Sequence, residues 1–255
     1  MNAVTAFFFV WALACMGPDG FSQEKDTLLL TPGHSLLKGH QLKTGRSSFT
    51  FLLTKDGQQQ KVGGLQEDLQ AVTVDHVQSY LRVCQISFGA NKILDSGLAA
   101  VSSLQPVYHR SFQTKKIMRF DFSAGMVAGA ITHLDSTGER IEPVRHPVTL
   151  PLFDSYYEDI IARSLSFKKG LVFKFPEYIY ERGGEVWSTG AIVGPQKKQD
   201  GKGGEVDAWE IRFYEHDGKG VIVRQTTYFI SAKDRNILSR EYKMGSTVLL
   251  MTPEA

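Results

Sequence analysis

From residue 45 onward the sequence alternates apolar and polar residues, and this period of two is typical of strands, not helices. Near the C-terminus, Trp209, Ile211 and Phe213 face one side of an extended segment, and the residues between them face the other. Turn signals such as Lys55-Asp56-Gly57 separate successive runs. The connections are too short for parallel crossovers, so we expect a single antiparallel sheet.

One segment, residues 153–165, breaks the alternation. Ser155 is followed three residues later by Glu158, which is typical of a capping box at the start of a helix. Apolar residues recur at helical spacing and form a stripe: Phe153, Tyr157, Ile160, Ile161 and Leu165. We therefore predict a helix of about three turns over residues 154–166, with one face buried against the sheet.

The N-terminal segment has a different pattern. Residues 3–16 are uncharged and densely apolar, and a polar stretch follows at residues 23–26. A run of about 14 apolar residues is too short to span a bilayer but matches the core of a signal peptide. We expect export, with a signal peptide over residues 1–22, an N-terminal extended segment over 23–44 and a single β-rich domain over 45–255. The alternative is a buried N-terminal strand or helix.

Two kinds of processing compete in this segment. Gly20-Phe21-Ser22 places small residues one and three positions before Gln23, which favours ordinary cleavage there. Alternatively, Leu13-Ala14-Cys15 resembles the motif at which bacterial lipoproteins are lipidated on the cysteine. We favour cleavage before Gln23. Either event leaves Cys84 in the body of the protein, where we interpret it as a small strand residue and not as a nucleophile.

Several classes of function are disfavoured by composition and motifs. The formal charge is +2, and Lys and Arg are dispersed among nearly as many acids, so we expect no nucleic-acid binding. No second long apolar run predicts a transmembrane helix. The HExxH and CxxC patterns of zinc sites and the GxSxG nucleophile elbow are missing. The sequence thus predicts no catalytic residue, metal site or cofactor, and we expect a non-enzymatic protein.

Short motifs in a particular order connect the chain to a known family. They are Tyr80–Val83, Leu104–Ser111, Phe120–Phe122, Val127–Gly129, Phe153–Tyr156, Tyr228–Ser231 and Ile237–Arg240. In order and spacing they resemble a family of bacterial exported proteins of unknown function, itself similar to the LolA/LolB lipoprotein carriers. The resemblance implies a mainly β fold, with a single curved antiparallel sheet forming a half-open barrel around the one short helix. The carriers have more helices than this sequence predicts.

From the curved sheet we expect a protein that binds or carries an apolar or amphipathic ligand, such as a lipid. Four aromatic residues would face inward: Phe173, Phe175, Trp209 and Phe213. The alternative is that these side chains only fill the core. On the less apolar side of the helix, Tyr156 and Arg163 are candidates to contact the polar head of a ligand, unless they are ordinary surface or rim residues.

Two other functions remain open. The protein could be a structural or interaction protein of the cell envelope that offers strand edges to a protein partner. A hydrolase with scattered catalytic residues is the third hypothesis. In each case the predicted location is the periplasm or the outer membrane of a Gram-negative bacterium.

Overall fold

The computed structural model describes residues 27–136, 138–199, 204–217 and 219–254. Over those residues the chain forms sixteen strands, one α-helix and three short 3-10 helices. In chain order the elements are β1 (Leu28–Leu29), η2 (Gly39–Gln41), β2 (Gly45–Lys55), β3 (Gln58–Val74), β4 (Val77–Phe88), β5 (Asn91–Ala100), β6 (Pro106–Gln113), β7 (Lys116–Ser123), β8 (Met126–Asp135), β9 (Gly138–Pro147), β10 (Phe153–Asp154), η3 (Ser155–Tyr157), α1 (Glu158–Ser164), β11 (Leu171–Ile179), η4 (Tyr180–Arg182), β12 (Gly184–Gln199), β13 (Glu205–His216), β14 (Ile222–Ser231), β15 (Ile237–Met244) and β16 (Thr247–Pro253).

All sixteen strands belong to one sheet that does not close. Its order is β1-β11-β12-β13-β14-β15-β16-β2-β3-β4-β5-β6-β7-β8-β9, with β10 also paired to β11. The C-terminal strand β16 pairs with β2, so the two halves of the chain join in the middle of the sheet. The predictions of a mainly β fold, one open sheet and one short helix are confirmed.

The prediction of a wholly antiparallel sheet is wrong at one edge. Two short segments, β1 and β10, both pair with β11 in parallel. Each contributes only two residues, and neither is joined to β11 by a hairpin: η3 and α1 lie between β10 and β11, and β2–β10 lie between β1 and β11. A parallel pair needs a long connection, which these intervening elements supply, and the two short segments show no alternation in the sequence. All other neighbouring strands are antiparallel.

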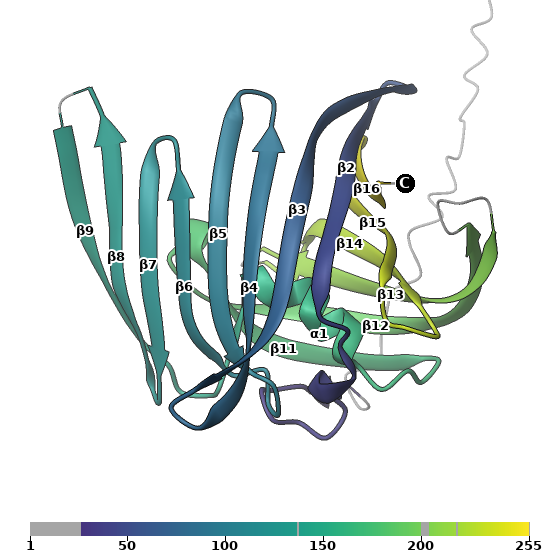
Figure 1. Ribbon diagram of the computed structural model, residues 1–255, viewed down its shortest axis with the longest axis horizontal. Helices are drawn as coiled ribbons and strands as arrows, with labels where there is room; N and C mark the ends of the chain where they lie inside the picture. Colours follow the sequence, from purple (N-terminus) through teal and green to yellow (C-terminus); the bar gives the residue numbers. More distant parts are fainter. Residues whose placement is uncertain (1–26, 137, 200–203, 218, 255) are drawn as a thin grey trace, which may run out of the picture.

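The sheet folds over so that its two halves form layers (Figure 1). Strands β2–β9 make one layer, and β11–β13 lie behind it and run across it. Helix α1 lies between the layers, on the concave side of the sheet. This arrangement places every side of the helix against other parts of the protein.

Tight turns of the expected kind connect the hairpins. Asp56 and Gly57, between β2 and β3, have φ of +52° and +77°. Two successive residues with positive φ are typical of the type I′ turn, whose twist matches that of the strands it joins. Asp75 and His76 repeat the arrangement between β3 and β4, with φ of +48° and +66°.

The predicted helix is shorter and begins differently. Residues 155–157 form η3 and residues 158–164 form α1, so the three turns expected over 154–166 are only partly α-helical. The predicted capping box is wrong: Oδ1 of Asp154 accepts a hydrogen bond from the Tyr156 amide at 2.9 Å, while Glu158 turns to the Tyr228 hydroxyl on β14. A tertiary partner for the Glu158 carboxylate has replaced the local one.

The core occupies the concave side of the sheet. The predicted apolar stripe of the helix is buried along its whole length, at Phe153, Tyr157, Ile160, Ile161 and Leu165. Three inward aromatic residues pack together, with ring centroids 5.4 Å apart for Phe175 and Phe213 and 6.0 Å for Phe173 and Phe175. Each large apolar side chain buried in this way contributes about 1.5–3 kcal/mol.

The N-terminal segment predicted to be extended contributes to the same core. Leu30, Leu37 and Leu42 are buried in it, and the Tyr80 hydroxyl donates a hydrogen bond to the Gly39 carbonyl at 2.8 Å. The predicted signal peptide, the cleavage before Gln23 and the lipidation of Cys15 concern residues outside the described part of the chain.

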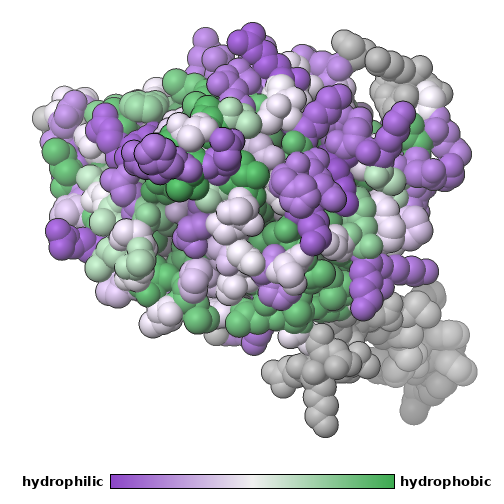
Figure 2. All heavy atoms as spheres, turned by 60° about the horizontal axis from the view of Figure 1, so that its bottom comes forward, coloured by the Kyte–Doolittle hydropathy of each residue, from purple (hydrophilic) through white to green (hydrophobic). Residues whose placement is uncertain are grey.

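On the face shown in Figure 2, patches of hydrophobic residues alternate with hydrophilic ones. In the described residues, no helix has both the length and the apolar character required to cross a bilayer.

Candidate functional site

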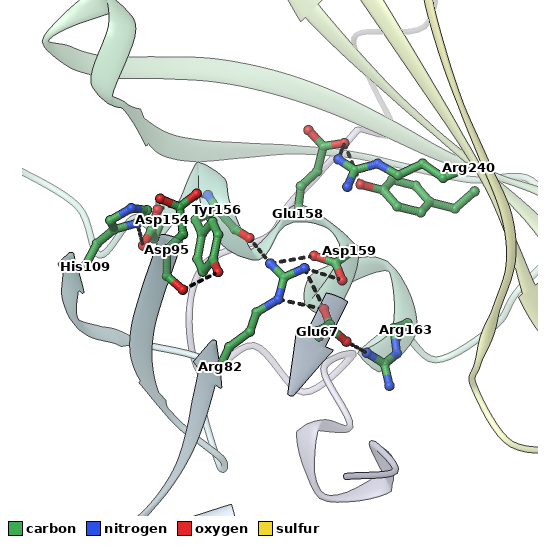
Figure 3. A network of polar contacts seen from close by, with 11 residues as sticks. Glu67, Arg82, Asp95, His109, Asp154, Tyr156, Glu158, Asp159, Arg163 and Arg240 are labelled. Carbon is green, nitrogen blue, oxygen red and sulfur yellow. Dashed lines mark hydrogen bonds and ion pairs between the residues drawn. The ribbon is translucent and has the colours of Figure 1, made fainter. Parts of the chain in front are cut away.

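The polar side of helix α1 is buried as thoroughly as its apolar stripe. All seven residues of α1 are buried, including Glu158, Asp159 and Arg163. Charged residues on both layers of the sheet face them (Figure 3). Buried charges are costly unless they are paired, so each partner of these three side chains is important for the fold.

Arg82 on β4 is the centre of this network (Figure 3). Its guanidinium lies 2.7 Å from Oε2 of Glu67 on β3 and 3.0 Å from Oδ1 of Asp159. It also donates a hydrogen bond to the carbonyl of Tyr156. Burial by itself lowers the pKa of Arg82, but the neighbouring carboxylate of Asp159, together with Glu67, raises it well above its usual value. Arg82 therefore joins the sheet to the start of the helix as a permanent cation.

Glu158 connects the helix to the other half of the sheet. Its carboxylate accepts hydrogen bonds at 2.9 Å from the Tyr228 hydroxyl and from Arg224, both on β14. Arg240 on β15 lies 3.6 Å away. The helix is thus held through charges from both directions, by Arg82 on one layer and by Arg224 and Arg240 on the other.

A second carboxyl group, Glu177 on β11, lies close to Glu158. It is fully buried, and one of its oxygens accepts a hydrogen bond from the Ser188 hydroxyl. Burial, followed by the nearby Glu158 carboxylate, raises the pKa of Glu177 to about 8. Glu177 is therefore mostly protonated at neutral pH.

A further polar group lies where η3 meets β6. Nδ1 of His109 is 3.0 Å from Oδ2 of Asp154, and the Tyr180 hydroxyl donates a hydrogen bond to Oδ1 of the same carboxylate. The His109 ring packs against Tyr156 and Tyr180, with centroids 4.7 and 4.4 Å apart. A His–Asp pair is a common element of general-base catalysis, but both members here are buried.

Cys84 lies next to the network, on the same strand face as Arg82. It is buried, and burial raises the pKa of its thiol to about 12. The thiol is therefore protonated at neutral pH, and only a thiolate is strongly nucleophilic.

A cleft of about 860 Å³ opens at the C-terminal end of α1. Charged groups that line it include Arg46, Glu67, Arg163, Lys197, Glu205, Asp207, Lys233, Asp234 and Glu254. Apolar side chains also line it, among them Phe49, Val206, Ile237, Leu238 and Pro253. The combination of a charged rim with apolar walls suits a ligand that has both polar and apolar parts.

The structure places the two predicted ligand residues in one network but not in one cavity. The Tyr156 hydroxyl donates a hydrogen bond to the Asp95 carbonyl at 3.2 Å, and Arg82 lies over its ring at 4.6 Å. Arg163 is 5% exposed, binds Glu67 at 3.3 Å and lines the cleft. Their role in ligand binding stays a prediction, and the geometry favours Arg163.

Sequence reasoning missed most of the network, including Glu67, Arg224 and Arg240. A signal was present for one pair. Glu67 alternates with Leu65 and Leu69, and Arg82 alternates with Tyr80 and Cys84, so both charges lie on the apolar faces of their strands. Glu67 and Arg82 therefore had to be buried and close enough to pair.

A search of curated proteins finds no match for this chain. A family model described as "Protein of unknown function (DUF3108)" matches residues 42–252, which extend from just before β2 into β16 and include the helix, the buried network and most residues of the cleft. The match extends over most of the sequence, and the chain belongs to the DUF3108 family.

Proposed function

We propose that this protein is an exported, non-enzymatic protein of the cell envelope that binds an amphipathic molecule in the cleft at the end of α1. The observation that carries the proposal is the position of Arg163, a buried cation at a cleft with apolar walls. The polar head of the ligand would bind at Arg163, and its apolar part would contact side chains such as Ile237 and Leu238.

Arg163 has donors left for a ligand. Its Nε donates to the Arg235 carbonyl at 3.0 Å, Nη1 to Glu67 at 3.3 Å and Nη2 to the Lys43 carbonyl at 3.3 Å. A guanidinium has five N–H groups, so these three contacts leave two. Lys233 also lines the cleft and forms no ion pair with any described residue. An anionic head, carboxylate or phosphate, fits these donors best.

The interior of the sheet is a less suitable place for the ligand. Helix α1 and the aromatic cluster around Phe175 and Phe213 fill the concave side. A LolA/LolB-like carrier would keep an apolar cavity there, so a ligand in this position has to displace the helix and its ion pairs. The cleft requires no such displacement, which is why we assign the ligand to it.

The proposed location follows from the N-terminal sequence. The apolar run at residues 3–16 and the small residues before Gln23 support export, and the periplasm or the outer membrane of a Gram-negative bacterium is the corresponding place. Cell fractionation with an antibody against the protein measures this directly. Recovery of the protein in the cytoplasm, with Met1 retained, would contradict it.

The binding proposal is tested with protein purified from the envelope fraction. Native mass spectrometry should show an added mass, which lipid extraction then identifies. Titration with oleate and with lysophosphatidylglycerol, each below its critical micelle concentration, should show saturable binding, whereas neutral dodecyl maltoside should bind more weakly. A clean unliganded mass together with no binding of either anionic probe would refute the proposal.

A charge reversal at the cleft gives a variant that should still fold. Lys233→Glu should weaken binding of the anionic probes by about fivefold, the effect of roughly 1 kcal/mol expected for one exposed charge. Lys219→Glu is the matched control, because Lys219 is exposed in the turn between β13 and β14 and does not line the cleft. Equal affinities for the two variants would argue against the cleft as the binding site.

The runner-up function, an interaction protein that pairs through a strand edge, has less support. Strand β9 forms one end of the sheet, and it contains Pro143 and Pro147 together with Glu139, Arg140 and Arg145. Prolines and charges on an edge strand oppose the addition of another strand.

A further inference from the structure

A row of four apolar side chains and one threonine crosses the outer face of strands β5–β9. The strand pairing places Leu94 opposite Phe112, Phe112 opposite Ile117, Ile117 opposite Thr132, and Thr132 opposite Ile141. These five residues, which we name the outer row, therefore lie side by side on five successive strands.

The outer row faces away from the core. Side chains alternate between the two faces of a strand, and the residues next to the row face inward. His109 and Ser111 are buried on the inner side of β6, and Met118 and Phe120 are buried on the inner side of β7. Phe112 and Ile117 must then point outward, and the layer formed by their strands lies in front of β11–β13 in Figure 1.

Three members of the outer row are exposed to an unusual degree for large apolar residues. Leu94 is 42% exposed, Phe112 40% and Ile141 65%, whereas Ile117 is half-buried and Thr132 is only 7% exposed. Single exposed apolar residues are common on soluble proteins, but several of them in register on one face indicate an interaction surface. The proposed ligand cleft does not explain it, because none of these residues lines the cleft.

Basic residues flank the outer row. Arg110 and Arg119 are directly opposite each other in the next row of the same face, and Lys92 is exposed on the other side of Leu94. Two like charges opposite each other on neighbouring strands repel and destabilise the pair. Arg110 is neutralised by Asp121, whereas Arg119 has no ion pair within the described residues and lies over the ring of Phe112 at 5.8 Å.

We infer that the outer face of β5–β9 docks onto an anionic lipid surface. The outer row would enter the boundary between headgroups and acyl chains, while Arg119, Lys92 and Arg110 contact lipid phosphates. Apolar burial and attraction to anionic lipids together are what hold peripheral proteins on membranes. A protein partner would need acidic groups at matching positions, whereas an anionic bilayer presents negative charge over the whole patch. The membrane is therefore the occupant that the charges favour.

The test is co-sedimentation of the full chain with vesicles of phosphatidylglycerol and phosphatidylcholine, compared with phosphatidylcholine alone. The unmodified chain should bind the mixed vesicles more strongly, and about 0.5 M salt should reduce the binding. The double variant Phe112→Ser, Ile141→Ser should bind at least tenfold more weakly, and Arg119→Gln about threefold more weakly. Every variant is compared in the same processed form, so its N-terminal residues are identical to those of the unmodified protein.

Two matched controls should leave vesicle binding unchanged: Val223→Ser on β14, another exposed apolar residue, and Lys219→Gln, an exposed basic residue in the turn between β13 and β14 that does not line the cleft. Circular dichroism and thermal unfolding verify that each variant is folded. Equal vesicle binding by the double variant and the unmodified chain would overturn the inference. So would a double variant that loses a crosslinked envelope protein in cells while its vesicle binding is unchanged, which would assign the surface to a protein partner.

Discussion

Glu177 gives the sharpest test of the buried network, because its protonation is linked to folding. Its side chain is 0% exposed on β11, near Glu158 and Glu215, and burial is the main reason that its pKa rises from 4.5 to about 8. In the unfolded chain the carboxyl ionises near pH 4.5, whereas in the folded chain it keeps its proton to about pH 8. Folding therefore takes up a proton throughout this interval.

The sign and size of the effect follow from this linkage. A group whose folded pKa is raised contributes its full stabilisation below the unfolded pKa, and that contribution is lost as the pH rises through the folded pKa. Across the interval from 4.5 to about 8, the loss is on the order of 5 kcal/mol, with a slope of up to about 1.4 kcal/mol per pH unit. That is a large fraction of the stability of an ordinary domain.

Glu177→Gln isolates this contribution. A glutamine has nearly the same shape, can still accept the hydrogen bond from Ser188 and stays neutral at every pH. Urea unfolding at a series of pH values from 5 to 9 should show similar free energies of unfolding for the two proteins near pH 5. Near pH 9 the variant should be more stable by several kcal/mol, with unchanged m-values.

Glu139→Gln on β9 is the control, because Glu139 is exposed and its variant should follow the unmodified protein at every pH. Parallel curves for Glu177→Gln and the unmodified protein between pH 5 and 9 would refute the reasoning. Glu177 would then be ionised in the folded protein, and the positive charge of Arg224 would outweigh burial.

Three further predictions concern the helix and its partners. Arg82→Met should lower the free energy of unfolding by roughly 3–5 kcal/mol in denaturant titrations, because it leaves the buried Asp159 carboxylate without its guanidinium partner and Glu67 with Arg163 alone. A loss below about 1 kcal/mol would mean that these carboxylates are not buried as described. Asp154→Ala should lower the free energy of unfolding by about 2 kcal/mol or more, because it removes the acceptor of the Tyr156 amide and of the Tyr180 hydroxyl, whereas Ser155→Ala should change it by less than about 0.5 kcal/mol. The reverse order would mean that Ser155 caps the helix, as the sequence indicates. Gly97→Ala should reduce thermal stability by an amount equivalent to about 1–3 kcal/mol, since its Cβ would lie 2.8 Å from the Tyr157 ring, while Gly184→Ala, with its nearest contact at 3.5 Å, should have little effect.

The architecture was predictable wherever alternation and turn residues act locally. The hairpins at Asp56-Gly57 and from β13 to β16 follow from residues that are adjacent in the sequence. The apolar stripe of the helix was equally predictable, because the burial of Ile160 and Ile161 follows from their spacing along the helix. The parallel segments β1 and β10 were not predictable, because two residues are too few to show a period.

The candidate site was less predictable because its charges pair over long sequence distances. Arg163 pairs with Glu67, 96 residues away, and Arg224 pairs with Glu158, 66 residues away. A charged residue on a predicted helix is normally assigned to solvent, and this assumption led to the interpretation of the helix as buried on one face only. Glu67 and Arg82 alternate with inward-facing apolar residues on their strands, and this was the sign in the sequence that the polar face of the helix is buried as well.

The buried charges determine where the helix lies more than how stable the protein is. Helix α1 has only seven residues, and a helix of that length does not form by itself in water, so its position depends on its contacts. Its apolar stripe alone would tolerate rotation or sliding against a smooth apolar surface. Ion pairs do not, because any shift separates Asp159 from Arg82 or Glu158 from Arg224 and leaves buried charges unpaired.

The C-terminal end of the helix is also held by contacts of a charged side chain. Nη1 of Arg235 donates a hydrogen bond to the Leu165 carbonyl at 2.6 Å, and its guanidinium lies over the Phe167 ring at 3.7 Å. Arg163 is thereby kept at the cleft with Glu67 as its partner. Since Glu67 also binds Arg82, an anion that binds the remaining N–H groups of Arg163 lies beside a carboxylate whose charge is shared with the centre of the network. Ligand binding in the cleft should therefore be sensitive to substitution of Arg82, even though Arg82 does not line the cleft.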